Sequence, residues 1–119
     1  MRFALIWLAV AGGLSAGVQA EPPKIMNDRV VDEHGMTLYV FDKDSPGKST
    51  CMDACASKWP AAMVDSYDKA SAPWSTLTRD AGQKQWAYKG RPLYRWSMDK
   101  KPGDMLGDGM YGVWHAARP

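Results

Sequence analysis

Two short segments, residues 38–41 and 93–96, are rich in β-branched and aromatic side chains, a pattern that predicts β-strands. Successive side chains of a strand point to opposite faces, so Tyr39 and Phe41 share one face of the first segment. In the second segment Arg95 stands at the position that a valine holds in the first. Because arginine is rarely buried, we predict that the aromatic face is the one that packs inside the protein.

These segments belong to an internal repeat with an offset of 55 residues, as from Gly35 to Gly90. Each copy reads Gly-x-x-Leu-Tyr-x-aromatic-x-x-Asp and is followed by a Pro-Gly turn and a later tryptophan. The repeated motif residues are Tyr39, Phe41 and Asp44 in the first copy and Tyr94, Trp96 and Asp99 in the second. The matches recur in order, so we predict two packed repeats, at about residues 29–60 and 84–116.

Each repeated segment is preceded by a second strand candidate, residues 29–32 in the first repeat and 85–88 in the second. A glycine lies between the two strands of each pair and supplies the positive φ that a tight turn requires. We therefore predict one β-hairpin in each repeat. Further strands are expected at residues 75–79 and 112–116.

One helix is predicted, over residues 51–58, with Ser49 or Thr50 as its N-cap and Pro60 marking its end. Taken together, the elements predict an α+β, β-rich fold class. The fold is expected to consist of two pseudo-symmetric β-hairpin repeats packed together with one short helix. The five tryptophans beyond the leader are expected to supply much of the core: Trp59, Trp74, Trp86, Trp96 and Trp114.

The start of the chain has the character of a leader. Arg2 is followed by an apolar run at residues 3–10 and then by small residues up to Ala20, a pattern that signal peptidase cleaves. The run is too short to cross a bilayer, which takes about 20 apolar residues. We expect residues 1–20 to be a signal peptide and residues 21–119 to be a single periplasmic or secreted domain, without a transmembrane anchor.

Charge and motifs exclude several classes of function. The chain has 15 Lys and Arg against 13 Asp and Glu, so it lacks the basic surplus of a nucleic-acid-binding protein. The sequence contains no nucleophile elbow, phosphate-binding loop or zinc-protease motif. We therefore predict that the protein is not an enzyme.

Cys51 and Cys55 are the only cysteines. In an oxidising compartment two lone cysteines usually pair, and residues four apart on a helical turn come close enough for a bond. We predict a disulfide between them. The alternative is a soft-metal site, above all for Cu(I), formed by the two thiolates, His115 and nearby methionines.

Four other polar residues are candidates for a site or a structural role. Asp44 and Asp99 follow strands at turns, where aspartate usually accepts backbone N–H bonds, so a structural role is predicted and ligand binding is the alternative. Asp104, in a glycine-rich loop, and His115 are possible ligand-binding residues. His115 could also ligate haem, although the chain has no Cys-x-x-Cys-His attachment motif.

The combination of motifs resembles a bacterial family of predicted lipoproteins, the secreted repeat of unknown function, which is described by a Tyr-x-(Phe/Trp/Tyr)-x-x-Asp motif. This chain has the motif at residues 39–44 and 94–99. It also has the family's Cys-x-x-x-Cys-Ala followed by Trp-Pro, at residues 51–60. It departs from the family in lacking a lipobox cysteine. The resemblance implies an exported two-repeat domain and no settled activity.

We therefore expect an exported cell-envelope protein that acts as a non-enzymatic binding or interaction module without a cofactor. Its expected partner is an envelope protein or a glycan. The alternative is a periplasmic protein for copper or haem handling, or an electron-transfer accessory. That alternative would use Cys51, Cys55 and His115.

Overall fold

The structure, a computed structural model, describes residues 22–65 and 68–119. These residues form seven short strands and one α-helix: β1 (Lys24–Met26), β2 (Arg29–Val31), β3 (Tyr39–Phe41), α1 (Ala54–Lys58), β4 (Trp74–Thr78), β5 (Lys84–Tyr88), β6 (Arg91–Pro92) and β7 (Trp114–Ala116). Two 3-10 turns are also present, η2 (Asp80–Gly82) and η3 (Met110–Gly112). The prediction of a β-rich fold with one short helix is confirmed.

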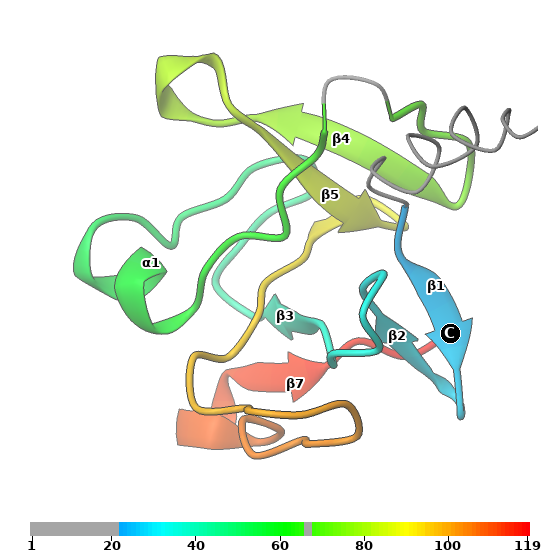
Figure 1. Cartoon of the computed structure of the whole chain (residues 1–119). Coiled ribbons are helices and arrows are strands. Elements are labelled where there is room, and N and C mark those ends of the chain that lie inside the picture. The colour runs from blue at the N-terminus through cyan, green and yellow to red at the C-terminus, as the bar shows by residue number, and fades with distance from the viewer. Residues whose placement is uncertain (1–21, 66–67) are drawn as a thin grey trace, which may run out of the picture.

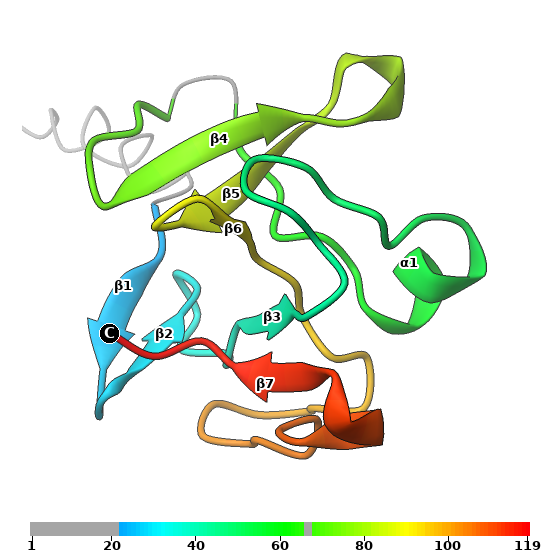
Figure 2. The same ribbon diagram turned by 180° about the vertical axis from the view of Figure 1, so that it is seen from behind.

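The strands pair antiparallel in three small sheets, β1–β2, β3–β7 and β4–β5–β6. In Figure 1 the β4–β5 hairpin crosses the top of the molecule, β3 and β7 lie below it, and α1 and the β1–β2 hairpin lie at opposite sides. The reverse view shows the same arrangement, with β6 beside β5 (Figure 2). Strands from the first repeat and from the end of the chain, β3 and β7, therefore meet in one sheet.

The hairpin predicted for the first repeat forms only in part. β2 pairs along its length with β1, a strand that we did not predict. β2 contacts its predicted partner, residues 38–41, only around the start of that segment. The contacts are a bridge between Val31 and Thr37 and a 3.0 Å hydrogen bond from the Leu38 N–H to the Val30 carbonyl. The rest of the predicted partner, β3, pairs with β7 instead.

The two repeated segments meet at Tyr39 and Tyr94. The Tyr39 N–H donates to the Tyr94 carbonyl at 2.8 Å, and the Tyr94 N–H donates to the Tyr39 carbonyl at 3.0 Å. Within residues 93–96 only Tyr94 forms isolated bridges, to Tyr39 and Ala61, so the strand that we predicted there does not form. The repeats are thus joined at the centre of their motifs.

Core side chains form two clusters on opposite faces of the repeated segments. The first cluster contains Val30, Leu38, Val40, Ala62, Trp86, Tyr88, Leu93 and Ala117. The second cluster contains Tyr39, Cys51, Trp59, Tyr94, Trp96, Trp114 and Ala116. The aromatic face is buried as predicted, apart from the half-buried Phe41, and the opposite face is buried as well, apart from Arg95. Of the five predicted core tryptophans, all but the half-buried Trp74 are buried.

Helix α1 is shorter than the predicted helix and starts at Ala54. The residue before it, Asp53, makes no side-chain capping bond. Neither predicted cap serves the helix, and the Thr50 side chain and N–H both donate to Asp44 instead. The predicted disulfide is confirmed, because Cys51 and Cys55 are bonded at 2.03 Å.

The predicted signal peptide and its cleavage site near Ala20 lie outside the described residues. Within residues 22–65 and 68–119, the structure contains no helix with the length and apolar character needed to cross a membrane.

Candidate functional site

The motif tyrosines and aspartates form two reciprocal hydrogen bonds between the repeats. The Tyr39 hydroxyl donates to Asp99 Oδ2 at 2.6 Å, and the Tyr94 hydroxyl donates to Asp44 Oδ2 at 2.6 Å. Each tyrosine therefore bonds the aspartate of the other repeat and not that of its own. The motif links the two copies to each other.

The second oxygen of each aspartate holds the loop that follows it. Asp99 Oδ1 accepts the Leu106 N–H at 3.0 Å, and Asp44 Oδ1 accepts the Thr50 N–H at 2.7 Å. Asp99 is 3% exposed, whereas Asp44 is half-buried. Both carboxylates have their oxygens occupied by the chain itself, an arrangement that favours the structural role predicted for them.

Both phenols are fully buried. Burial raises the pKa of Tyr39 far above its ordinary value of about 10, and the hydrogen bond to Asp99 raises it further. Burial followed by the hydrogen bond to Asp44 has the same effect on the pKa of Tyr94. Both hydroxyls therefore stay protonated well into the alkaline range.

A pH titration tests the contribution of the two reciprocal tyrosine–aspartate hydrogen bonds to stability. The raised pKa values mean that, above about pH 10, the folded protein holds protons on Tyr39 and Tyr94 that the unfolded chain has lost. The stability from these bonds should be complete below pH 10, and the free energy of unfolding should fall as the pH rises above it. Absorbance at 295 nm should show these two phenols ionising only together with loss of the folded circular dichroism signal. Ionisation of both while the fold persists would contradict the prediction.

A row of four aromatic rings fills the second cluster. Phe41 stacks on Trp114 with ring centroids 4.2 Å apart, and Trp114 stacks on Trp59 at 3.8 Å. Trp96 continues the row at 4.1 Å from Trp59. Gly107 lies against the row, where a Cβ atom would be 2.7 Å from the Trp59 ring, so only glycine fits. The row therefore fixes the glycine-rich loop against the core.

The two predicted ligand-binding residues are each engaged in local contacts. Asp104 accepts the Lys101 ammonium at 2.8 Å and the Lys100 N–H at 2.8 Å, and these donors, the Lys101 ammonium above all, lower the pKa of Asp104 to about 2. His115, on β7, contacts Asp42 with 2.8 Å between Nε2 and Oδ2. The structure does not bring Asp104 and His115 into one site.

The disulfide bears on the copper alternative. Neither sulfur of Cys51 and Cys55 is available as a thiolate ligand in this form. In the described part of the chain, no group of three or more His, Cys, Asp or Glu side chains could hold a metal ion. Copper binding through these cysteines would require the reduced protein, and it stays a prediction.

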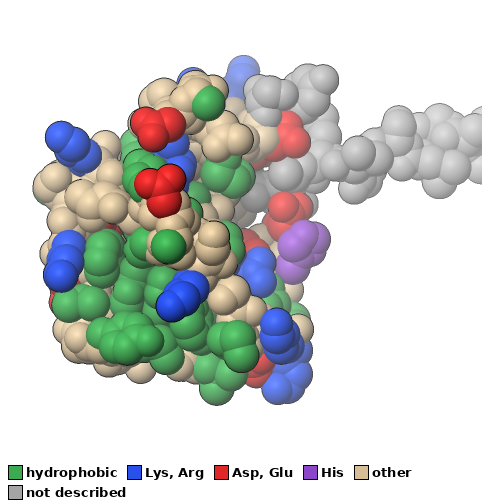
Figure 3. Space-filling model, turned by 90° about the vertical axis from the view of Figure 1, so that its left-hand side faces the viewer, with side chains coloured by type: hydrophobic (Ala, Val, Ile, Leu, Met, Phe, Trp, Pro, Cys, Tyr) green, Lys and Arg blue, Asp and Glu red, His purple; other side chains and the backbone are tan. Residues whose placement is uncertain are grey.

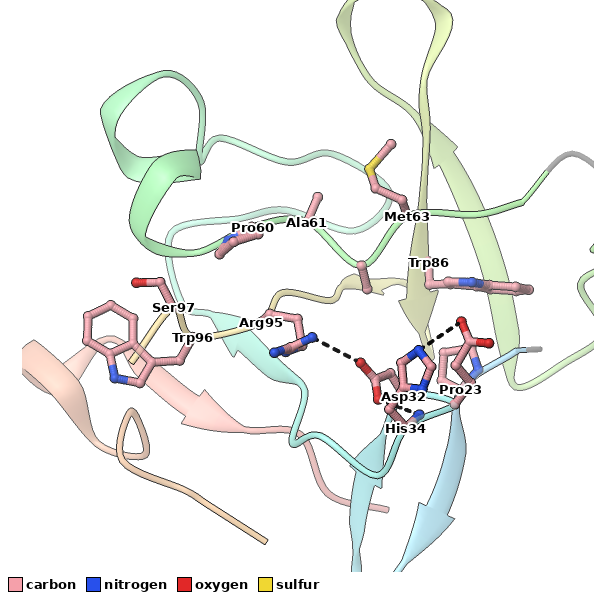
Figure 4. A pocket seen from close by; sticks show the side chains of 12 residues that line it. Pro23, Asp32, His34, Pro60, Ala61, Met63, Trp86, Arg95, Trp96 and Ser97 are labelled. Atoms are coloured by element: carbon pink, nitrogen blue, oxygen red, sulfur yellow. Dashed lines mark hydrogen bonds and ion pairs between the residues drawn. The ribbon is translucent and has the colours of Figure 1, made fainter. Parts of the chain in front are cut away.

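A cleft of about 350 Å³ opens where three separate segments meet, residues 32–34, 60–63 and 95–97. Figure 4 shows Pro60, Ala61 and Met63 on one side of it and Asp32, His34 and Arg95 on the other. The polar lining side chains are Asp32, Glu33, His34, Arg95 and Ser97, and the apolar walls include Met63, Trp86 and Trp96. This volume lies at the lower end of the range of about 300–1,000 Å³ for small-ligand pockets.

Arg95 is the charged centre of the cleft. Its Nη1 lies 3.3 Å from Asp32 Oδ2, and Asp32 is fixed in turn by the backbone N–H groups of His34 and Met36. Its Nε is buried and makes no hydrogen bond with any residue that the structure describes. An unpaired buried donor costs about 1–3 kcal/mol, so a native protein rarely keeps one without a reason.

The repeat shows why Arg95 is unusual. The matching residue of the first repeat, Val40, is buried in the first cluster, whereas the Arg95 side chain is 31% exposed. In the sequence, this exchange of valine for arginine indicated only which face is buried, and Arg95 was not predicted as a site residue. Its departure from the repeat was the signal that could have identified it.

A second surface feature lies on the face that carries α1 and η3. Figure 3 shows hydrophobic side chains gathered on the lower half of this face. Phe41, Met105, Met110 and Val113 are half-buried against the second cluster, and Tyr111 is 79% exposed.

The comparisons with known proteins concern the family alone. No curated protein and no solved structure matches the chain. The family model described as "Secreted repeat of unknown function" matches residues 28–63 and 75–118, one stretch for each repeat. Because these stretches include both copies of the Tyr–Asp motif and most of the chain, the chain belongs to the family of the secreted repeat of unknown function.

Proposed function

We propose that the protein is an exported, non-enzymatic binding module of the cell envelope whose ligand site is the Arg95 cleft. The observation that carries the proposal is Arg95 itself, a partly exposed arginine at a position where the other repeat has a core valine. If this position had only a structural role, valine would fill it equally well. Its ion pair with Asp32 engages only Nη1, so guanidinium donors remain for a bound acceptor.

The lining of the cleft indicates the kind of ligand. Arg95 donates hydrogen bonds, while Asp32 and Glu33 can accept them. Trp86 and Trp96 add apolar wall. A polar organic molecule with donors, acceptors and an apolar part would match all three features.

The reciprocal contacts support a further part of the proposal, that the repeats are related by a pseudo-twofold axis. The Tyr39–Asp99 and Tyr94–Asp44 bonds exchange partners in the way that such an axis requires. The turn glycines behave alike, because Gly35 lies against Pro102 and Gly90 lies against Pro46. In this interpretation the two repeats form the scaffold of the domain, and the ligand site lies at Arg95, a position where the two repeats differ.

Ligand-observed NMR with a set of N-acetylated amino-acid amides and monosaccharides tests the site. Fragments that bind the wild-type protein should bind Arg95→Val about 10–100-fold more weakly, because a hydrogen bond to a charged group contributes about 1.5–3 kcal/mol. Stability should change little, since valine is the residue of the matching position. The matched control is Arg91→Val, which removes an exposed arginine paired with Asp42 at 3.5 Å.

The control should leave fragment binding unchanged. Equal binding to wild type and Arg95→Val, or no fragment bound at all, would contradict the proposed site. Native mass spectrometry of the exported protein provides an independent check, because a copurified copper or haem mass would favour the cofactor alternative.

A further inference from the structure

Residues 60–64 form the open edge of the sheet region beside the Arg95 cleft. Bonds from this segment run to one side only, at alternate residues: Arg95 N–H to Pro60 O at 2.7 Å, Ala62 N–H to Leu93 O at 3.0 Å, Trp86 N–H to Ala62 O at 2.8 Å and Val64 N–H to Lys84 O at 3.0 Å. This is the pattern of a strand paired along one side.

The intervening residues, Ala61 and Met63, lie opposite Tyr94 and Gln85 in antiparallel bridges, as pairs that exchange no backbone hydrogen bond. Their backbone N–H and C=O groups make no hydrogen bond within residues 22–65 and 68–119. In an extended chain the groups of alternate residues point to opposite sides, so those of Ala61 and Met63 point away from the neighbouring strands. Ala61 is half-buried and Met63 is 46% exposed, which leaves this side of the segment open.

Natural proteins usually protect such an edge with lysine, an inward charge or a bulge. Residues 60–64 carry no charge, and their one proline, Pro60, is at the start of the segment and uses its carbonyl on the paired side. An unprotected edge next to a cleft is suited to accept another strand, a recognised way in which proteins bind extended peptides.

Resting on the proposed function, we propose that the ligand is an extended peptide segment of a partner protein. The peptide adds as a strand along Ala61 and Met63 and places one acidic side chain against Arg95. Backbone amides supply the donors and acceptors that the edge lacks. A carboxylate would give Arg95 a charge-assisted bond, which is about twice as strong as a neutral one. The same residues, 60–63, line the cleft, so edge and cleft are adjacent (Figure 4).

The test begins with affinity selection from a degenerate pool of blocked six-residue peptides on the exported protein and on Arg95→Val. Retained peptides should be enriched in one acidic residue, and at least tenfold fewer should be retained by Arg95→Val. Single N-methylation along a retained peptide should then lower its affinity at least tenfold at alternate positions and less than twofold at those between. That alternation reports strand pairing, which a side-chain contact alone would not produce.

Two variants of the protein complete the experiment. Ala61→Pro removes the unpaired N–H and should abolish peptide binding, whereas Ala61→Val keeps the N–H and should retain it. Fragments that bind at Arg95 while no N-methyl alternation appears would overturn the peptide inference and leave the proposed function standing. Failure of both fragments and peptides would overturn both. A dimer in sedimentation that Ala61→Pro abolishes would show a second copy on this edge and would also overturn the inference.

Discussion

Replacing Trp59 by alanine is expected to lower the free energy of unfolding by about 4 kcal/mol, the range for removing a buried tryptophan. Trp59 is 3% exposed and stacks between Trp114 and Trp96, while the Tyr39 ring packs edge-on at 5.4 Å. The change would leave a void in the middle of the row and remove the ring against which Gly107 packs. In a domain of this size the Tm should fall by roughly 20 °C, measurable by circular dichroism during thermal unfolding.

Trp74→Ala is the matched control for this prediction. Trp74 is half-buried at the margin of the first cluster, where Tyr88 is its ring contact at 4.9 Å. Its loss should cost about 2 kcal/mol or less, because much of the site is already open to water. If Trp59→Ala were no more destabilising than Trp74→Ala, the row of rings would not be the centre of the core.

Asp99→Ala is expected to cost about 3 kcal/mol, because it leaves the buried Tyr39 hydroxyl and the Leu106 N–H without their acceptor. Once Asp99 is absent, Tyr39→Phe should cost less than it does in the wild type, since the hydroxyl has already lost its acceptor and keeps only the 3.2 Å bond from the Gly107 N–H. The double-mutant cycle in urea unfolding should therefore give a coupling energy of about 1.5–3 kcal/mol.

The repeat supplies the control for this cycle. Asp99→Ala combined with Tyr94→Phe joins residues of the same motif copy that are not bonded, so these changes should add to within about 0.5 kcal/mol. The Asp44 and Tyr94 cycle should show coupling again, with a smaller loss for Asp44→Ala because Asp44 is only half-buried. The reciprocal hydrogen bonds between the repeats would be contradicted if the tyrosine and aspartate of the same motif copy showed a coupling energy and those of different copies were additive.

Local patterns in the sequence were sufficient for much of the fold. The alternation at residues 38–41 and 93–96 located the centre of the protein, and the repeat showed that two similar units were present. Cysteine spacing and the secretory character predicted the disulfide. These features depend on residues close together in the chain, where propensity and spacing are informative.

The pairings that were missed are long-range. β3 pairs with β7, more than 70 residues later, and β2 pairs along its length with β1, while only Thr37 and Leu38, around the start of its predicted partner, bond to it. A half-buried strand pattern shows which face is apolar but does not identify the neighbour. The burial of the second face of the repeated segments was not predicted for the same reason. Leu38 and Leu93 on this face pack in one cluster with Ala62 and Trp86, which come from other segments.

The candidate site was the least predictable part of the molecule. Most of its lining residues come from three segments that are distant in the sequence, and none belongs to a motif with known chemistry. Asp104 and His115 were predicted as ligand-binding residues because of their residue type. In the structure Asp104 bonds to Lys101 and His115 contacts Asp42. Arg95 could be recognised only by its departure from the repeat, together with the position of Asp32 in the folded chain.

The most direct measurement of the central claim is a map of backbone amide shifts in an isotope-labelled sample during titration with the fragments that bind. If the Arg95 cleft is the binding site, the largest shifts should fall on residues 32–34, 61–63 and 95–97, which surround it. Shifts concentrated at residues 105–113, on the hydrophobic face around η3, would contradict it and place the binding surface elsewhere.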